Sequence, residues 1–178
     1  DADRSRDRQR LATVRLNQAE QAAAYFATVA DSWDLLRSLH VPEEAVEAAI
    51  VEAMQGRVVD TLIDLGTGTG RMLELLAGHY RRGIGIDASR EMIAVARAKL
   101  AACSIGHAQV RLGDIADLDA GAGRADVIVV HQVLHYFDDP GRVLAQARRA
   151  LKPGGEMLIV DFAPHGLEFL RSHHAHRR

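Results

Sequence analysis

Residues 61–72 read TLIDLGTGTGRM, and this short stretch decides the fold. An apolar strand from Thr61 to Leu65 runs directly into three alternating glycines, and a helix is predicted to begin at Arg71. Glycine tolerates positive φ angles and lets the backbone approach a ligand closely. The turn over residues 66–70 therefore predicts a site that binds a nucleotide-like molecule through its backbone.

The spacing of the glycines distinguishes between several kinds of nucleotide-binding site. The dinucleotide fingerprint GxGxxG needs its third glycine one position after Gly70, and position 71 is arginine. A phosphate-binding loop needs a lysine followed by serine or threonine, and that pair is absent from this turn. A nicotinamide-dependent oxidoreductase is therefore kept only as a weaker alternative.

A second signal follows the glycine turn at a characteristic distance. Residues 83–87 read GIGID and predict a strand that ends in the carboxylate of Asp87. An acid at this place in a βαβ unit accepts hydrogen bonds from ribose hydroxyls. The alternative interpretation of Asp87 is a carboxylate that caps the following helix.

Strand and helix patterns alternate along the rest of the chain. Helices are predicted over residues 71–77, from Ser89 to about Cys103 and from Asp139-Pro140 onward, and further strands over residues 109–112, 126–130 and 157–160. Residues 152–155, KPGG, are predicted to end the last helix before the fifth strand. The series predicts an α/β fold with a doubly wound, mainly parallel sheet, whose ligand lies where strand order reverses between the first and fourth strands.

Composition limits the kinds of partner. The 178 residues include 22 basic and 24 acidic side chains, a net charge of −2 that gives no general attraction for nucleic acid or an anionic membrane. The single cysteine, Cys103, excludes an internal disulfide, and no signal peptide or membrane-spanning run is apparent, so we expect a cytoplasmic protein. We predict three parts: a solvated linker over residues 1–10, an N-terminal helical cap over residues 11–56 and the α/β core over residues 57–178.

Five motifs carry a family resemblance. Between Thr61 and Phe162 the chain contains, in order, LIDLGTGTGRMLELLA, GIGIDAS, GDIADL, DVIVVHQVLHYFDDP and LKPGGEMLIVDF. This set resembles the motifs of class I S-adenosylmethionine-dependent methyltransferases. The resemblance implies a Rossmann-like methyltransferase fold with a seven-stranded sheet, S-adenosylmethionine as donor, S-adenosylhomocysteine as product and a small-molecule methyl acceptor.

The resemblance also implies a role for each motif. The glycine turn would face the methionine part of the donor, Asp87 the ribose and Asp114 the adenine amino group, although Asp114 could also be a solvated loop residue. Met92 would pack near adenine or, equally well, fill the core. The complete set of expected donor-binding residues is Asp64, Gly66, Thr67, Gly68, Gly70, Asp87, Ala88, Met92, Gly113, Asp114, Ile115, His131, Gln132, Tyr25, Phe26 and Trp33.

Two narrower resemblances concern the ends of the chain. Tyr25, Phe26 and Trp33 resemble the leading helix of ubiquinone and menaquinone biosynthesis methyltransferases, which implies a lid over the donor, although an aromatic stripe at helical spacing can simply be core. HQVLHYFDDP and VDFAPH resemble the methyltransferase half of bacterial proteins that carry an ArsR-type winged helix at their N-terminus. That similarity implies an upstream DNA-binding domain and an alternative function as a sensor of S-adenosylmethionine or S-adenosylhomocysteine.

Methyl transfer requires alignment of donor and acceptor more than any particular side chain. A base is needed only for a protonated acceptor, and His131 is our candidate for that role, with His135 second, although either histidine could be structural. No metal site is expected, because Cys103 is the only thiol that could join the histidines of the C-terminal segment: His165, His173, His174 and His176.

The end of the sequence raises a question about the sheet. In the resembled family, a helix and an antiparallel pair of strands follow strand five, and this sequence reaches Arg178 without them. We expect either that these C-terminal strands are missing from the sequence shown, or that a partner chain, for example in a homodimer, covers the edge of strand five.

Overall fold

The computed structural model describes two long stretches of the chain, residues 43–118 and 123–162. It also describes eight isolated positions of the N-terminal segment: Arg6, Arg10, Thr13, Ala24, Tyr25, Thr28, Val29 and Ala30. Two of the expected lid residues, Phe26 and Trp33, lie outside the described residues, as do the four C-terminal histidines.

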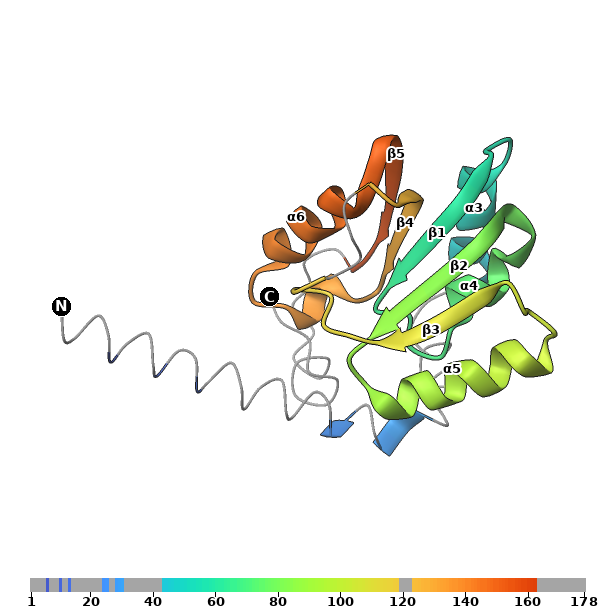
Figure 1. Cartoon of the computed structure of the whole chain (residues 1–178). Helices are drawn as coiled ribbons and strands as arrows, with labels where there is room; N and C mark the ends of the chain where they lie inside the picture. The colour runs from blue at the N-terminus through green and yellow to red at the C-terminus, as the bar shows by residue number, and fades with distance from the viewer. Residues whose placement is uncertain are drawn as a thin grey trace.

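The described elements alternate between helix and strand, as predicted (Figure 1). They are α3 (Glu43–Met54), β1 (Val59–Leu65), α4 (Arg71–Leu75), η2 (Ala77–His79), β2 (Tyr80–Asp87), α5 (Arg90–Ala102), β3 (Ala108–Leu112), β4 (Ala125–His131), η3 (Leu134–Tyr136), α6 (Pro140–Ala150) and β5 (Leu151–Val160), where η marks a single 3-10 turn. The five strands form one sheet in the order β3-β2-β1-β4-β5, and every neighbouring pair is parallel. The α/β prediction is confirmed, and strand order reverses between β1 and β4.

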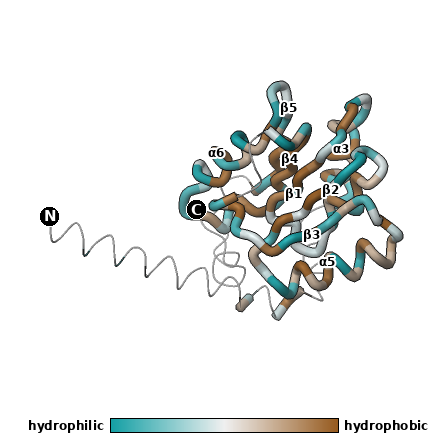
Figure 2. The backbone as a smooth tube through the Cα atoms, viewed as in Figure 1, coloured by the Kyte–Doolittle hydropathy of each residue, from teal (hydrophilic) through white to brown (hydrophobic). Residues whose placement is uncertain are grey.

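Both faces of the central strands are buried, because alternate residues point into two separate cores. Leu62 of β1 and Val127 of β4 pack with α3, α4 and α5 on one face. Their chain neighbours Ile63 and Ile128 pack with α6 on the other. Apolar residues accordingly run through the centre of the sheet, while the outer faces of the helices are more hydrophilic (Figure 2). Strands buried on both faces explain why the sequence showed continuous apolar runs instead of alternation.

Side-chain caps fix where two of the helices begin. The Ser89 hydroxyl accepts a hydrogen bond from the Met92 amide at 3.2 Å at the start of α5. Asp139 accepts from the Arg142 amide at 3.3 Å, and Pro140 is the first residue of α6. Both starts agree with the capping residues predicted from the sequence.

The fifth strand differs from the prediction. Residues 152–155 were expected to separate α6 from a short strand, and this was wrong, because β5 already begins at Leu151. Its pairing with β4 jumps from Ala125↔Leu151 to Val127↔Glu156, so residues 152–155 form an irregular widening of the strand. Gly154, at φ +79°, supplies the conformation that this irregularity needs.

Strands β3 and β5 form the two edges of the described sheet. Leu112 of β3 and Ile159 of β5 are 45% and 44% exposed, far more than the apolar residues of the central strands. The antiparallel pair that would complete a seven-stranded sheet is not among the described residues.

Within the described part of the chain, none of the helices is long and apolar enough to cross a membrane.

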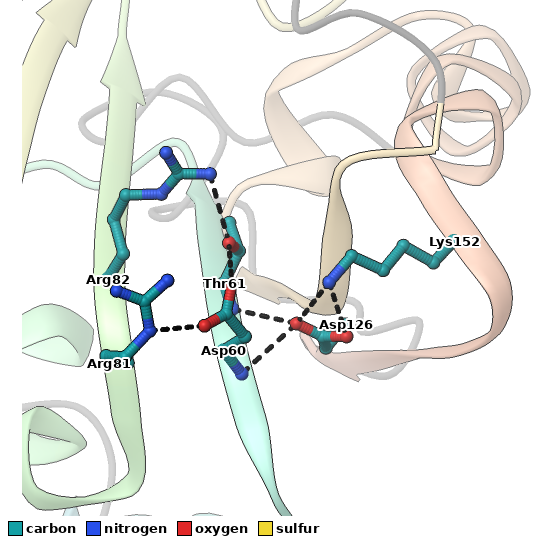
Figure 3. Close-up of polar contacts among 6 residues, drawn as sticks. All are labelled: Asp60, Thr61, Arg81, Arg82, Asp126 and Lys152. Carbon is teal, nitrogen blue, oxygen red and sulfur yellow. Dashed lines mark hydrogen bonds and ion pairs between the residues drawn. The ribbon is translucent and has the colours of Figure 1, made fainter.

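The amino ends of the strands are joined by a polar cluster (Figure 3). One oxygen of Asp126, near the start of β4, accepts hydrogen bonds from the amides of Asp60 at 3.1 Å and Thr61 at 2.8 Å, at the start of β1. Lys152 of β5 donates to both oxygens of the same carboxylate, at 2.8 and 2.9 Å. Asp126 therefore connects three neighbouring strands at their amino ends, and the glycine turn lies at the opposite, carboxyl ends.

We expect this carboxylate to contribute stability only while it is ionised. Partial burial alone would raise the pKa of Asp126, but Lys152 and the two amide donors outweigh that effect and lower it. A lowered pKa in the folded state gives stability that is present above the ordinary value of 3.8 and is lost as the pH falls through the folded value. In urea denaturation, Asp126→Asn should therefore lose about 1–3 kcal/mol at pH 7. The difference from wild type should shrink in acid, and an equal difference at both pH values would contradict this account.

Candidate functional site

The glycine turn joins the end of β1 to the start of α4. Gly66, Gly68 and Gly70 all have positive φ, at +73°, +52° and +81°. The amides of Gly66 and Thr67 both donate to the carbonyl oxygen of Ile86 in β2, at 2.8 and 3.0 Å. The turn is thus held by the backbone of the neighbouring strand in a conformation that favours glycine.

Asp64, in β1, contacts Thr67 of this turn. The Thr67 hydroxyl donates to a carboxylate oxygen of Asp64 at 2.6 Å, and both residues are buried, with Asp64 only 1% exposed. A buried carboxylate that holds the turn acts as a support, so contact between Asp64 and a donor stays a prediction.

Asp87 closes β2 directly beside the turn. One carboxylate oxygen accepts from the Gly68 amide at 2.8 Å, and the other from the Ser89 amide at 2.9 Å. Burial raises the pKa of Asp87, and the hydrogen bonds from the amides of Ser89, Gly68 and Ala88 oppose that rise in part. The two signals that the sequence placed 19 residues apart meet in one hydrogen bond.

Gly70 is the N-cap of α4 and marks a close approach between two helices. A Cβ atom at this position would lie 3.3 Å from the Cβ of Ala96 in α5, tighter than most real contacts. The lack of a side chain at Gly70 therefore lets the start of α4 lie against α5.

The third expected motif follows β3. The Gly113 amide donates to the Asp87 carbonyl at 2.9 Å, which brings this loop to the end of β2. Asp114 is exposed and accepts from the Ala116 amide at 2.8 Å, whereas Ile115 is 4% exposed and packs in the core on the α6 side. The turn formed by Asp114 fits a loop aspartate, and its exposure leaves the carboxylate accessible.

Two further expected residues follow Asp87 and differ sharply in exposure. Ala88 is exposed beside the carboxylate. Met92 is 1% exposed within α5, so the core-filling alternative describes its side chain in this structure. Contact of Met92 with adenine, and of Ala88 with the donor, stays a prediction.

The carboxyl end of β4 lies next to the same turn. His131 is the last residue of β4 and is partly buried, and Gln132 after it has an unusual positive φ of +52°. The Gln132 amide donates to the Val160 carbonyl at 2.7 Å, which ties this loop to β5. Val133 packs directly over Gly66, because a Cβ added to that glycine would fall 2.9 Å from the Val133 Cβ and nearer still to its Cγ2.

Asp161 is a residue that the sequence analysis did not single out. Its carboxylate contacts His135 Nδ1 at 2.6 Å and accepts from the amides of Val133 and Leu134, at 3.1 and 2.7 Å. Burial alone would raise the pKa of Asp161, but His135 and the amides outweigh it and lower the value. A signal was available, since Asp161 follows strand five much as Asp87 closes strand two.

Aromatic side chains surround His135. The Tyr136 and Phe162 rings lie 4.0 and 5.1 Å from the imidazole, measured between ring centroids. Burial raises the pKa of Tyr136, and Tyr25 and Asp161 add to the rise. Tyr25, the expected lid residue that the structure describes, is therefore within electrostatic range of this group.

An ion pair fastens α3 to the start of α4. Arg71, directly after Gly70, donates from Nε and Nη2 to the two carboxylate oxygens of Glu47 at 2.7 and 2.5 Å, and from Nη1 to Glu74 at 3.1 Å. The bidentate geometry with Glu47 is the stronger form of such a contact. Helix α3 is thus fixed to the turn.

A group of three or more side chains able to hold a metal ion is not found in the described stretches of the chain. Cys103 is exposed, and its sulfur lies 3.7 Å from a Glu74 carboxylate oxygen.

Two glycines allow the contact with Val133 to be tested separately from backbone strain. Gly56 and Gly66 have nearly the same φ, +72° and +73°, but a Cβ at Gly56 would meet nothing within 4 Å. Gly56→Ala should cost about 1–2 kcal/mol in urea denaturation, from the left-handed conformation alone. Gly66→Ala should cost about 1–3 kcal/mol more, because it adds the collision with Val133. Equal losses would show that Val133 gives way freely.

Several of the known proteins that this chain resembles are methyltransferases. A family model described as a methyltransferase domain matches residues 63–159. The chain is 31% identical over 146 residues to a demethylmenaquinone methyltransferase of Thermobifida fusca, a match covering 79% of this chain and 61% of that protein. It is 37% identical over 112 residues to an arsenite methyltransferase of Aquipseudomonas alcaligenes, covering 56% of this chain and 32% of the relative. The chain therefore spans 61% and 32% of the length of these two curated relatives.

A solved structure extends the similarity to three dimensions. The complex named DhpI-SAM-HEP superimposes with a TM-score of 0.68 at 25% identity, covering 86% of this chain and 70% of the other. The family match includes β1 from Ile63, the glycine turn, Asp87 and β4, which are the parts that build the site. The chain belongs to the methyltransferase-domain family, within the class I S-adenosylmethionine-dependent methyltransferases.

Proposed function

We propose that this protein transfers a methyl group from S-adenosylmethionine to a small-molecule acceptor, and that the donor binds across the glycine turn and Asp87. The hydrogen bond from the Gly68 amide to Asp87 carries the proposal, because it brings the turn and the acid to one point. Both lie at the carboxyl ends of parallel strands, beside the place where strand order reverses.

The residues present fit the donor. Three glycines with positive φ present backbone without side chains, as a closely approaching ligand requires. Asp87 is held in place by amides of its own chain and offers a carboxylate to a vicinal diol. Asp114, exposed after β3, is the proposed contact for the adenine amino group, with Ile115 beside it.

The donor supplies a methyl group on a positively charged sulfur, so that a bond from the acceptor to the methyl carbon forms as the carbon–sulfur bond breaks and its electrons return to sulfur. The task of the chain is to align the two reactants and exclude water. The turn is fixed for this task by Asp64, which accepts from the Thr67 hydroxyl, and by the Ile86 carbonyl, which accepts from two amides of the turn.

We assign proton removal from a protonated acceptor to His131. It is the last residue of β4, so it lies at the carboxyl ends of the strands, as the turn does, and it is only partly buried. The ring of His135 is held by Asp161 and its side chain is 8% exposed, which suits a structural role better than contact with an acceptor. An imidazole titrates near neutral pH and can accept such a proton.

The similarity to arsenite methyltransferases does not extend the proposal to arsenic. Soft metalloid ions are held by several thiolates, and the sequence given has only Cys103. The sensor function implied by the resemblance to ArsR-type fusions stays a prediction, and the following experiment separates it from catalysis.

Transfer of label should identify the activity. The protein is incubated with S-adenosylmethionine carrying a radioactive methyl group and with a panel of hydroxyl, amine and thiol acceptors, and labelled products are extracted. We expect transfer to at least one small-molecule class and its loss in Gly68→Val, whose side chain would fill the turn. Tight binding of S-adenosylhomocysteine without transfer to any acceptor would favour the sensor, and no binding at all would refute the donor site.

Asp87→Asn tests the ribose contact directly. The amide keeps the size of the carboxylate but loses the charge, so the affinity for S-adenosylhomocysteine should fall by about 1.5–3 kcal/mol in calorimetry, roughly ten- to a hundredfold.

The pH dependence gives a second measure of the same contact. Because burial raises the pKa of Asp87, acid should protonate it sooner than an exposed aspartate and weaken binding as the pH falls through that value. Asp87→Asn should remove this dependence. An unchanged affinity in the variant, or the same pH profile, would show that the ribose lies elsewhere.

A further inference from the structure

The carboxylate of Asp161 organises the loop that follows β4. Its Oδ2 atom accepts hydrogen bonds from two consecutive amides, Val133 at 3.1 Å and Leu134 at 2.7 Å. Its Oδ1 atom contacts His135 Nδ1 at 2.6 Å and accepts from the Phe162 amide at 2.8 Å. The side chain is 13% exposed, so these contacts form largely out of solvent, where hydrogen bonds to a charged group are strong.

The loop held by Asp161 touches the glycine turn through one residue. Val133 covers Gly66 so closely that a single added methyl group at the glycine would collide with its Cβ and Cγ2 and press tightly on Cγ1. Gly66 in turn donates to the Ile86 carbonyl, one residue before Asp87. A continuous path of contacts therefore runs from Asp161 through Val133 to the turn.

We propose that Asp161 is a positioning residue for donor binding: by fixing the Val133 and Leu134 amides it presses Val133 onto Gly66 and holds the turn in its binding conformation. This role rests on the proposed donor site, but Asp161 lies outside that site and would contribute to donor affinity indirectly. Asp161 acts through Val133 and need not touch the ligand.

The fold contains a matched control for this carboxylate. Asp126 also accepts two consecutive amides on one oxygen, from Asp60 and Thr61, and also binds a basic side chain, Lys152 (Figure 3). It lies at the amino ends of the strands, away from the turn. Asp126→Asn and Asp161→Asn thus remove the same kind of contact at opposite ends of the sheet.

Calorimetry with S-adenosylhomocysteine on the full chain tests the proposal. Asp161→Asn should weaken binding by about tenfold, close to the lower value for the loss of one hydrogen bond to a charged group. Asp126→Asn should lower the stability against urea. It should leave the affinity within about twofold of wild type, because Asp126 is distant from the donor site and shares no partner with it among the described contacts. In nuclear magnetic resonance spectra, the Gly66 amide signal should move in Asp161→Asn and stay in place in Asp126→Asn.

Variants of Val133 test the path itself. Val133→Ala removes both γ carbons and should weaken binding, whereas Val133→Ile keeps them and should bind like wild type. The double variant Asp161→Asn with Val133→Ala should lose little more than the larger single loss, because the two residues act in series.

The possible results are distinguishable. Fully additive losses, or equal affinities for Asp161→Asn and Asp126→Asn, would overturn the positioning role. If Asp161→Asn does not fold, equal binding by Val133→Ala and Val133→Ile would overturn it, and a selective loss in Val133→Ala would support it. Failure of the wild-type protein to bind S-adenosylhomocysteine would refute the proposed function, whereas wild-type binding with an unaffected Asp161→Asn would refute only this inference.

Discussion

The register between β1 and β2 is the constraint on which the site depends. Leu65 pairs with Ile86, so the first residues of the glycine turn arrive opposite the last residues of β2. In this register the Ile86 carbonyl receives two amides of the turn and Asp87 receives a third, from Gly68. A slip by one residue would exchange the buried faces of the strand and remove these hydrogen bonds together. The same pairing that buries the sheet therefore also builds the ligand-binding turn.

The two ends of the sheet use carboxylates for different purposes. At the amino ends, Asp126 is paired with Lys152 and closes the strands with an ion pair. At the carboxyl ends, Asp87 is held by backbone amides without a basic partner among its described contacts, so its charge remains available to a ligand. The burial that raises its pKa also makes each of its hydrogen bonds more valuable. This contrast agrees with the general rule that parallel α/β sheets bind ligands at their carboxyl ends.

Local patterns were sufficient to predict the elements and their order. The apolar runs of the strands and the capping residues Ser89 and Asp139 lie within a few residues of the elements that they determine, and these predictions were confirmed. The contacts that the sequence did not reveal join residues far apart in the chain. Val133 on Gly66 is one case, and Asp161 on the loop after β4 is another. Neither leaves a periodic signal, because each depends on which strands become neighbours.

The irregular widening of β5 shows a second reason why local sequence does not always predict an element. KPGG is a common way to end a helix, and the sequence alone does not show that pairing with β4 draws the same residues into a strand. Tertiary pairing overrode the local preference at this place, as it often does in strands.

The strand order also has a consequence for how the chain is made. Strand β1 pairs with β2 soon after both leave the ribosome, but its other neighbour, β4, follows only after β2, α5 and β3. The bond between Thr61 and Asp126 spans 65 residues. Until the residues up to β4 are synthesised and β4 pairs with β1, one apolar edge of β1 has no neighbouring strand. Unpaired strand edges of this kind promote association with other chains. The central position that makes β1 the best-protected strand of the finished sheet makes it the one exposed longest during translation.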